Sequence, residues 1–117
     1  MQFICYPKCT TCQKAQKYLD AHQITYKLRD IKLNNPSCDE LKAWYTQSGL
    51  PLKKFFNTSG LLYKSLNLKE RLLSMSEEEQ LQLLATDGML VKRPLLVSSQ
   101  AVLVGFKELE WEKILNA

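Results

Sequence analysis

Two cysteines three residues apart, Cys9 and Cys12, carry the clearest chemical signal in this sequence. They lie between an apolar run at residues 3–6, which predicts a strand, and a helical pattern that starts near residue 10. A thiol at such a turn faces unpaired backbone N–H groups and the positive end of the helix dipole, and both favour the thiolate. We therefore expect Cys9 to be a nucleophile. Cys12 lies one helical turn further on the same face, where it can act as a resolving thiol.

Two other uses of a CxxC pair stay open. A structural zinc site needs two more ligands, but Cys5, His22 and Cys38 are scattered rather than paired at ligand spacing. A permanent structural disulfide would close so short a loop that it removes little chain entropy. The pattern favours redox chemistry, with no metal site and no bound cofactor.

The remaining cysteines and the histidine have structural interpretations. Cys5 belongs to the first apolar run and is expected to be a small buried side chain. His22 is expected to cap the end of the first helix. Cys38 falls in the first turn of a later helix, whose dipole could activate it, but no partner lies nearby in the sequence. We interpret Cys38 as structural.

The elements that position the thiol pair follow from hydrophobic periodicity. A helix over residues 10–21 turns Cys12 toward the core, and the alternation of Ile24, Tyr26 and Leu28 predicts a second strand over residues 24–31. A strand, a helix and a strand in so short a stretch predict a βαβ unit with parallel strands.

A helical insertion and a β-hairpin complete the predicted order. A capping box begins a helix at residues 37–40, and Ser76 begins another helix over residues 77–85. Strands over residues 95–97 and 101–104 have so short a link that they predict an antiparallel hairpin. Within the helical insertion, we expect a helix end at Gly49 and Pro51, a short helix and turn near a surface cleft over residues 53–60, and a helix over residues 68–73. The helical block is expected to end at Asp87-Gly88, and the last strand at Gly105. A closing helix is expected to have Trp111, Ile114 and Leu115 on its apolar side.

The composition limits the classes of protein to which this chain can belong. The chain has 117 residues, of which 45% are hydrophobic and 24% charged, and we expect residues 1–117 to form a single soluble domain. The net charge of +4 comes from lysines spread along the chain, so no direct nucleic-acid binding is predicted. Neither a charged leader nor a membrane-spanning apolar segment is present, which predicts a cytoplasmic protein without a membrane partner.

The order of elements, with CxxC at the first strand-to-helix turn, is similar to the α/β thioredoxin fold, which glutaredoxin-like proteins share. Over essentially the whole chain, four motifs resemble the arsenate reductase (ArsC) and Spx family. They are Cys9-Thr10-Thr11-Cys12-Gln13-Lys14-Ala15, Phe56-Asn57-Thr58-Ser59-Gly60, Lys92-Arg93-Pro94 and Val104-Gly105-Phe106.

The resemblance implies residue roles. Cys9 matches the family's nucleophilic cysteine, and Arg93 matches an arginine that precedes a cis-proline, here Pro94. The guanidinium of Arg93 would bind an oxyanion or the thiolate, together with the helix N-terminus at Thr10 and Thr11.

The sequence departs from the family at Ser59, where many members carry an arginine. Arg93 then lacks a second anion-binding arginine, and Lys64 or Lys107 would replace it without the bidentate fork. The departure predicts inefficient arsenate reduction.

Two functions follow from the resemblance. The first is a thiol-disulfide oxidoreductase that acts on a small oxyanion or a disulfide and is reset by an external thiol donor of the thioredoxin, glutaredoxin or glutathione type. The alternative is an Spx-like redox-sensing transcriptional regulator that binds RNA polymerase. Spx proteins usually carry a tail after the final helix, and this sequence stops soon after that helix, which favours the enzyme.

Overall fold

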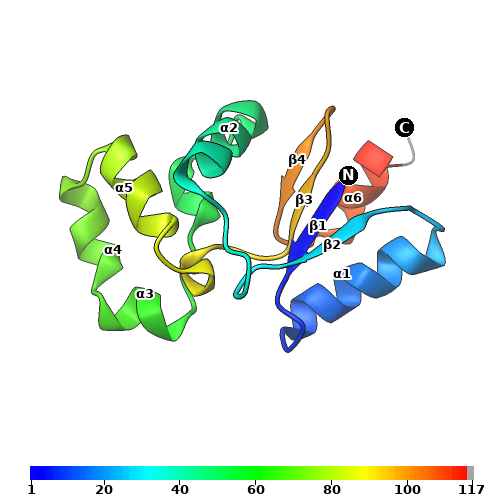
Figure 1. Ribbon diagram of the computed structural model, residues 1–117, viewed down its shortest axis with the longest axis horizontal. Coiled ribbons are helices and arrows are strands. Elements are labelled where there is room, and N and C mark those ends of the chain that lie inside the picture. Colours follow the sequence, from blue (N-terminus) through cyan, green and yellow to red (C-terminus); the bar gives the residue numbers. More distant parts are fainter. Residues whose placement is uncertain (116–117) are drawn as a thin grey trace. The chain divides into compact units, whose positions relative to one another are not determined.

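The computed structural model describes residues 1–115, which fall into two compact units (Figure 1). The first unit combines residues 1–30 with the chain from residue 93 onward and contains the sheet, and the second comprises residues 31–92 and is mainly helical. The expectation of a single domain over residues 1–117 stays a prediction.

The sheet of the first unit has the strand order β2-β1-β3-β4. The central strand β1 pairs in parallel with β2 and antiparallel with β3, and β3 forms an antiparallel hairpin with β4. The predicted βαβ unit, hairpin and thioredoxin-like α/β class are therefore confirmed. The elements of this unit are β1 Gln2–Cys5, α1 Thr10–Ala21, β2 Lys27–Asp30, β3 Leu95–Val97, β4 Val102–Val104 and α6 Glu108–Leu115.

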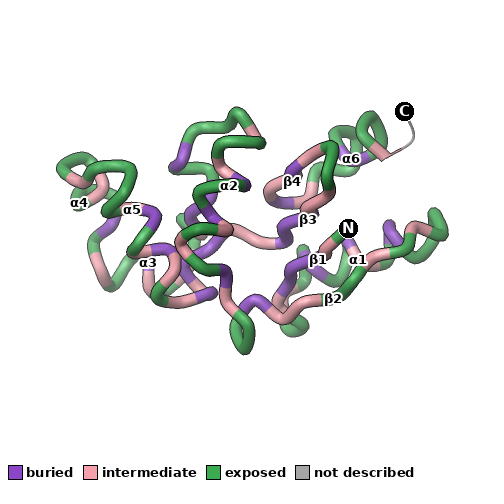
Figure 2. Tube along the Cα trace, turned by 45° about the horizontal axis from the view of Figure 1, so that its top comes forward, coloured by how far each residue is buried: buried purple, intermediate pink, exposed green. Residues whose placement is uncertain are grey.

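One face of this sheet holds the hydrophobic core that supports the CxxC motif. Phe3 and Cys5 point to the same face of β1, because side chains alternate along a strand, and both pack in a cluster with Cys12 of α1 and Trp111 of α6. The Trp111 side chain is 1% exposed, and its indole Nε1–H donates a hydrogen bond to the Gly105 carbonyl at 3.0 Å. Figure 2 shows the buried positions along β1 and β3.

Two expectations for this unit differ from the structure. The strand expected over residues 24–31 is β2, which covers only Lys27–Asp30 at the edge of the sheet. Leu28, one of the alternating apolar residues that predicted this strand, is 54% exposed. Ile114, assigned to the apolar side of the last helix, is 48% exposed, whereas Trp111 is buried as expected.

The helices of the second unit begin at the predicted caps. In both long helices, the N-cap serine accepts from the N–H of a glutamate three residues later, whose carboxylate accepts from the serine N–H. Gly49 ends the first of them with φ of 69°, a backbone conformation that glycine adopts without strain. The elements are α2 Cys38–Ser48, η1 Leu52–Phe55, α3 Leu61–Ser65, α4 Leu68–Arg71, η2 Leu72–Ser74, α5 Glu77–Leu84 and η3 Gly88–Leu90.

The end of the helical block differs from the prediction. Asp87 does not end it but caps a further 3-10 turn, η3, by accepting a hydrogen bond from the Met89 N–H at 2.8 Å. The helix expected over residues 68–73 is α4 followed by the 3-10 turn η2. Within residues 1–115, no helix combines the length and the apolarity that crossing a membrane requires.

Candidate active site

Cys9 lies at the N-terminus of α1, where the sequence placed it. It is the N-cap residue with extended backbone, its N–H donates to the Tyr6 carbonyl at 2.9 Å, and its own carbonyl accepts from Gln13 at 3.0 Å. The N–H groups of Thr10 and Thr11 precede this first helical bond, so the helix itself offers them no acceptor. This first turn can donate hydrogen bonds to an anion next to the thiol.

The two thiols of the motif differ in access to solvent. Cys9 is half-buried, whereas Cys12 is 1% exposed because it lies on the core face of α1. Both are free thiols, as are Cys5 and Cys38. A substrate can therefore reach Cys9, and Cys12 is available mainly to groups already bound at Cys9.

Hydrogen bonds surround the sulfur of Cys12. The Tyr6 N–H donates to it at 3.3 Å, and the side chains of Cys5 and Cys9 are both hydrogen-bonded to it. The hydrogen bond with Cys5, followed by burial, raises the pKa of Cys12 well above that of a free thiol, against the opposing effects of Tyr6 and Cys9. At neutral pH Cys12 is therefore a protonated thiol.

Cys5 is buried, at 3% exposure, as the sequence predicted. The interpretation of Cys5 as an isolated small side chain missed its contact with Cys12. The hydrogen bond from Cys12 lowers the pKa of Cys5, although burial, the Asp30 carboxylate and Cys9 oppose this shift. Asp30 is the register partner of Cys5 on β2. Nothing in the local sequence pattern could have identified the pair, because it joins a strand to the following helix.

Arg93 has buried hydrogen-bond donors without acceptors. Within the described residues, its Nε and Nη1 atoms are buried and make no hydrogen bond. Its guanidinium carbon lies 5.4 Å from the centroid of the Tyr6 ring, a cation–π contact. The Arg93-Pro94 peptide bond is cis, as the resemblance implied, and the Pro94 carbonyl accepts from the Gly105 N–H at 2.8 Å.

Tyr6 connects the predicted site residues in the first unit. Its ring contacts Arg93, its N–H binds the sulfur of Cys12, and its carbonyl binds the N–H of Cys9. From the sequence, Tyr6 is expected only to be part of the first apolar strand. Its place immediately before the turn that presents Cys9 was the one available signal.

Other residues singled out in the sequence lie elsewhere. Ser59 belongs to the second unit, where its hydroxyl donates to Asn57 Oδ1 at 3.4 Å, and Lys64 lies on α3. Lys107 is exposed, and its Nζ lies 4.0 Å from a Glu110 oxygen. His22 is the C-cap of α1 and Cys38 is the first residue of α2, both as expected. Among residues 1–115, no group of three or more His, Cys, Asp or Glu side chains has an arrangement that could hold a metal ion.

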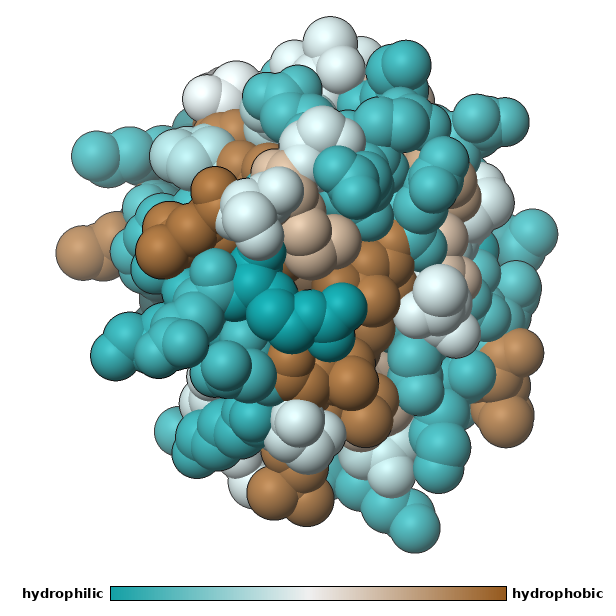
Figure 3. Space-filling model, turned by 90° about the vertical axis from the view of Figure 1, so that its left-hand side faces the viewer, coloured by the Kyte–Doolittle hydropathy of each residue, from teal (hydrophilic) through white to brown (hydrophobic). Residues whose placement is uncertain are grey.

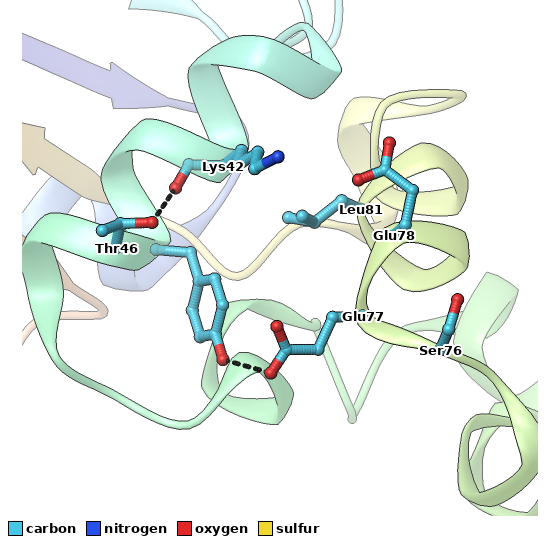
Figure 4. A pocket seen from close by; sticks show the side chains of 7 residues that line it. Lys42, Thr46, Ser76, Glu77, Glu78 and Leu81 are labelled. Atoms are coloured by element: carbon cyan, nitrogen blue, oxygen red, sulfur yellow. Dashed lines mark hydrogen bonds between the residues drawn. The ribbon is translucent and has the colours of Figure 1, made fainter.

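The second unit contains a pocket of about 350 Å³ between α2 and α5 (Figure 4). The Tyr45 hydroxyl donates to Glu77 Oε1 at 2.9 Å, and this bond raises the pKa of Tyr45. The lining residues are Lys42, Tyr45, Thr46, Ser76, Glu77, Glu78 and Leu81. None of these lining residues is a cysteine, and the CxxC motif lies in the first unit.

The model of the ArsC family matches residues 5–114 of this chain. The chain belongs to the ArsC family. It is 56% identical to the uncharacterized protein YusI of Bacillus subtilis, over 97% of this chain and 96% of that protein. It is 31% identical to the regulatory protein MgsR of the same organism, over 97% and 89% of the two chains. Its identity to the global transcriptional regulator Spx of Enterococcus faecalis is 28%, over 93% and 81%.

Solved structures of ArsC-family proteins have the same fold. An ArsC-family-related protein from Bacteroides fragilis superposes with a TM-score of 0.94 at 58% identity, over 97% of this chain and 95% of that one. A possible arsenate reductase from Streptococcus mutans superposes with a TM-score of 0.85 at 47% identity, over 91% and 90%. The family thus includes relatives named as reductases and relatives named as regulators.

Proposed function

We propose that this ArsC-family protein is a thiol-disulfide oxidoreductase in which Cys9 is the nucleophile and Cys12 the resolving thiol. One observation carries the proposal: an accessible thiol at a helix N-terminus is hydrogen-bonded to a buried thiol one turn further on. In this arrangement, Cys9 can react with a substrate from solvent, whereas Cys12 reacts only with the intermediate bound to Cys9.

The reaction requires two exchanges of sulfur bonds. The Cys9 thiolate attacks one sulfur of a substrate disulfide, forms a mixed disulfide, and releases the other sulfur as a thiolate. Cys12 then loses its proton and attacks the Cys9 sulfur, which forms the Cys9–Cys12 disulfide and releases the second substrate thiolate. The substrate gains two electrons and the protein loses two. An external donor of the thioredoxin, glutaredoxin or glutathione type returns them.

A small oxyanion such as arsenate is the other substrate class. The first turn of α1 supplies N–H donors at Thr10 and Thr11, and Arg93 supplies buried guanidinium N–H groups that lack acceptors. Pro94 follows Arg93 and immediately precedes β3. A turnover assay with arsenate and with a disulfide, each with the three types of donor, tests the proposal. If no combination of substrate and donor gives turnover, the proposed enzymatic function is refuted.

The pH dependence of the second step follows from the raised pKa of Cys12. Because only the thiolate attacks, its fraction and hence the rate of resolution rise roughly tenfold per pH unit below that pKa. We expect stopped-flow measurements between pH 6 and 9 to show release of the second substrate thiol accelerating throughout this range. A plateau near pH 7 would show that Cys12 is already ionised there and would contradict the assignment.

A regulator that binds RNA polymerase is the second candidate. It is favoured by the relatives named MgsR and Spx, and by a groove of about 420 Å³ on the second unit, lined by both apolar and charged side chains. Leu72 and Leu73 of η2 line this groove, and Leu73 is 88% exposed. Figure 3 shows apolar side chains in the middle of one face of the helices α3 to α5, interrupted and surrounded by polar side chains. In this function the thiol pair would be a redox switch.

A polymerase pull-down separates the two candidates. If the groove binds polymerase, Leu73→Glu abolishes capture because it replaces an exposed apolar contact by a charge, whereas Leu109→Glu leaves capture unchanged. Leu109 is a matched control because it is 74% exposed on α6 of the first unit. Equal capture of both variants, or no capture of the wild type, would exclude this use of the groove.

A further inference from the structure

The sulfur of Cys12 has two thiol neighbours, Cys9 and Cys5, and both are hydrogen-bonded to it. The proposed reaction uses only Cys9. Cys5 lies on β1 and Cys12 on α1, and their side chains share one buried cluster with Cys9 packed against it. Access to solvent decreases from Cys9, which is half-buried, to the almost fully buried Cys12 and Cys5.

We propose that Cys5 is a third redox thiol, which takes over the disulfide from Cys9 by attacking Cys12. The inference rests on the proposed function, because the Cys9–Cys12 disulfide must form first. The Cys5 thiolate attacks the Cys12 sulfur, so the Cys5–Cys12 bond forms and the Cys9–Cys12 bond breaks. The electron pair leaves on the Cys9 sulfur, which takes up from solvent the equivalent of the proton that Cys5 lost. No further oxidant is consumed.

Two features of the site favour this exchange. In the reduced protein the side chains of Cys5 and Cys12 are hydrogen-bonded and pack in the same buried cluster, so the attacking and attacked sulfurs are already neighbours. The leaving thiolate on Cys9 is released at the N-terminus of α1, where the unpaired N–H groups of the first turn stabilise negative charge.

The consequence is an oxidised protein with a free nucleophile. After the exchange, the disulfide lies in the core between β1 and α1, and Cys9 is again a thiol that a second substrate can reach. Cys38 is not part of this group, because it lies on α2 of the second unit. It provides a matched control cysteine.

Lys8 makes the exchange measurable, because trypsin cleavage after it separates Cys5 from the other two thiols. Cys5 lies in the peptide of residues 1–8, and Cys9 and Cys12 share the peptide of residues 9–14. The full chain is oxidised with diamide, quenched in acid, alkylated with N-ethylmaleimide, digested and analysed by mass spectrometry without reduction. A Cys9–Cys12 bond stays within one peptide, whereas a Cys5–Cys12 bond joins the two.

The expected product is the joined pair of peptides with N-ethylmaleimide on Cys9. The joined pair is lost in Cys5→Ser and retained in Cys38→Ser. In Cys9→Ser, where exchange through Cys9 is impossible, the peptides are joined more slowly and without the label on residue 9. The inference is overturned if oxidised wild type contains only the bond within residues 9–14, if the label lies on Cys12, or if Cys9→Ser joins the peptides as fast as wild type. The first two outcomes are read in wild type, so they do not depend on whether Cys5→Ser folds.

The same experiment separates this inference from the function on which it rests. Wild type that forms the Cys9–Cys12 bond and turns over substrate, but never joins the two peptides, would refute only the role of Cys5. Wild type that forms neither bond would refute the oxidoreductase itself.

Discussion

Cys9→Ser is expected to reduce thiol-disulfide exchange roughly a thousandfold or more, to the uncatalysed background, because the hydroxyl is not ionised at neutral pH and cannot replace the thiolate. Cys9 is the half-buried N-cap of α1, and the substitution exchanges its sulfur for an oxygen at the edge of the core. The measurement is turnover of a disulfide substrate with a thioredoxin-type donor. Circular dichroism serves as the control for folding.

Cys12→Ser should have a different consequence, which gives the assignment a second check. The first exchange at Cys9 still occurs, but no resolving thiol is present, so the mixed disulfide between Cys9 and substrate accumulates. Intact-mass spectrometry then detects the mass of one substrate thiol added to the protein. If Cys12→Ser turns over as fast as wild type, or if the adduct forms on a cysteine other than Cys9, the division of roles is wrong.

Arg93→Ala is expected to weaken oxyanion binding by one to two powers of ten. The guanidinium has buried Nε and Nη1 donors without acceptors in the described structure, so an anion at this position gains charge-assisted hydrogen bonds. Losing such a contact costs about 1.5–3 kcal/mol. Isothermal titration calorimetry with arsenate and with sulfate measures the change in affinity.

Two controls distinguish a binding role of Arg93 from a structural one. Arg93→Lys keeps the charge but lacks the fork of N–H groups, so its affinity should lie between those of wild type and Arg93→Ala. Arg93→Met should not lower the free energy of unfolding by more than about 1 kcal/mol, since it removes buried donors that lack partners and loses mainly the cation–π contact with Tyr6. Unchanged anion affinity in Arg93→Ala would refute the site.

Most of the secondary structure and the position of the thiol pair could be predicted from the sequence. These features depend on local interactions: the periodicity of α1, the capping boxes at Ser37 and Ser76, and the left-handed conformation at Gly49. A side chain that caps a helix or an apolar residue that recurs every turn acts within a few residues, so its effect can be predicted from neighbours in the chain. The cis Arg93-Pro94 bond followed from the family resemblance.

Only the tertiary structure decided which side chains surround the sulfur of Cys12. The register of β1 and the packing of α1 against it bring Cys5 to Cys12, and the return of the chain at β3 brings Arg93 to the ring of Tyr6. The exposure of Leu28 on the edge strand β2 likewise depends on which elements pack against that strand. Contacts of this kind form only when secondary-structure elements pack against one another. The periodicity within one segment does not show which other element will cover that segment.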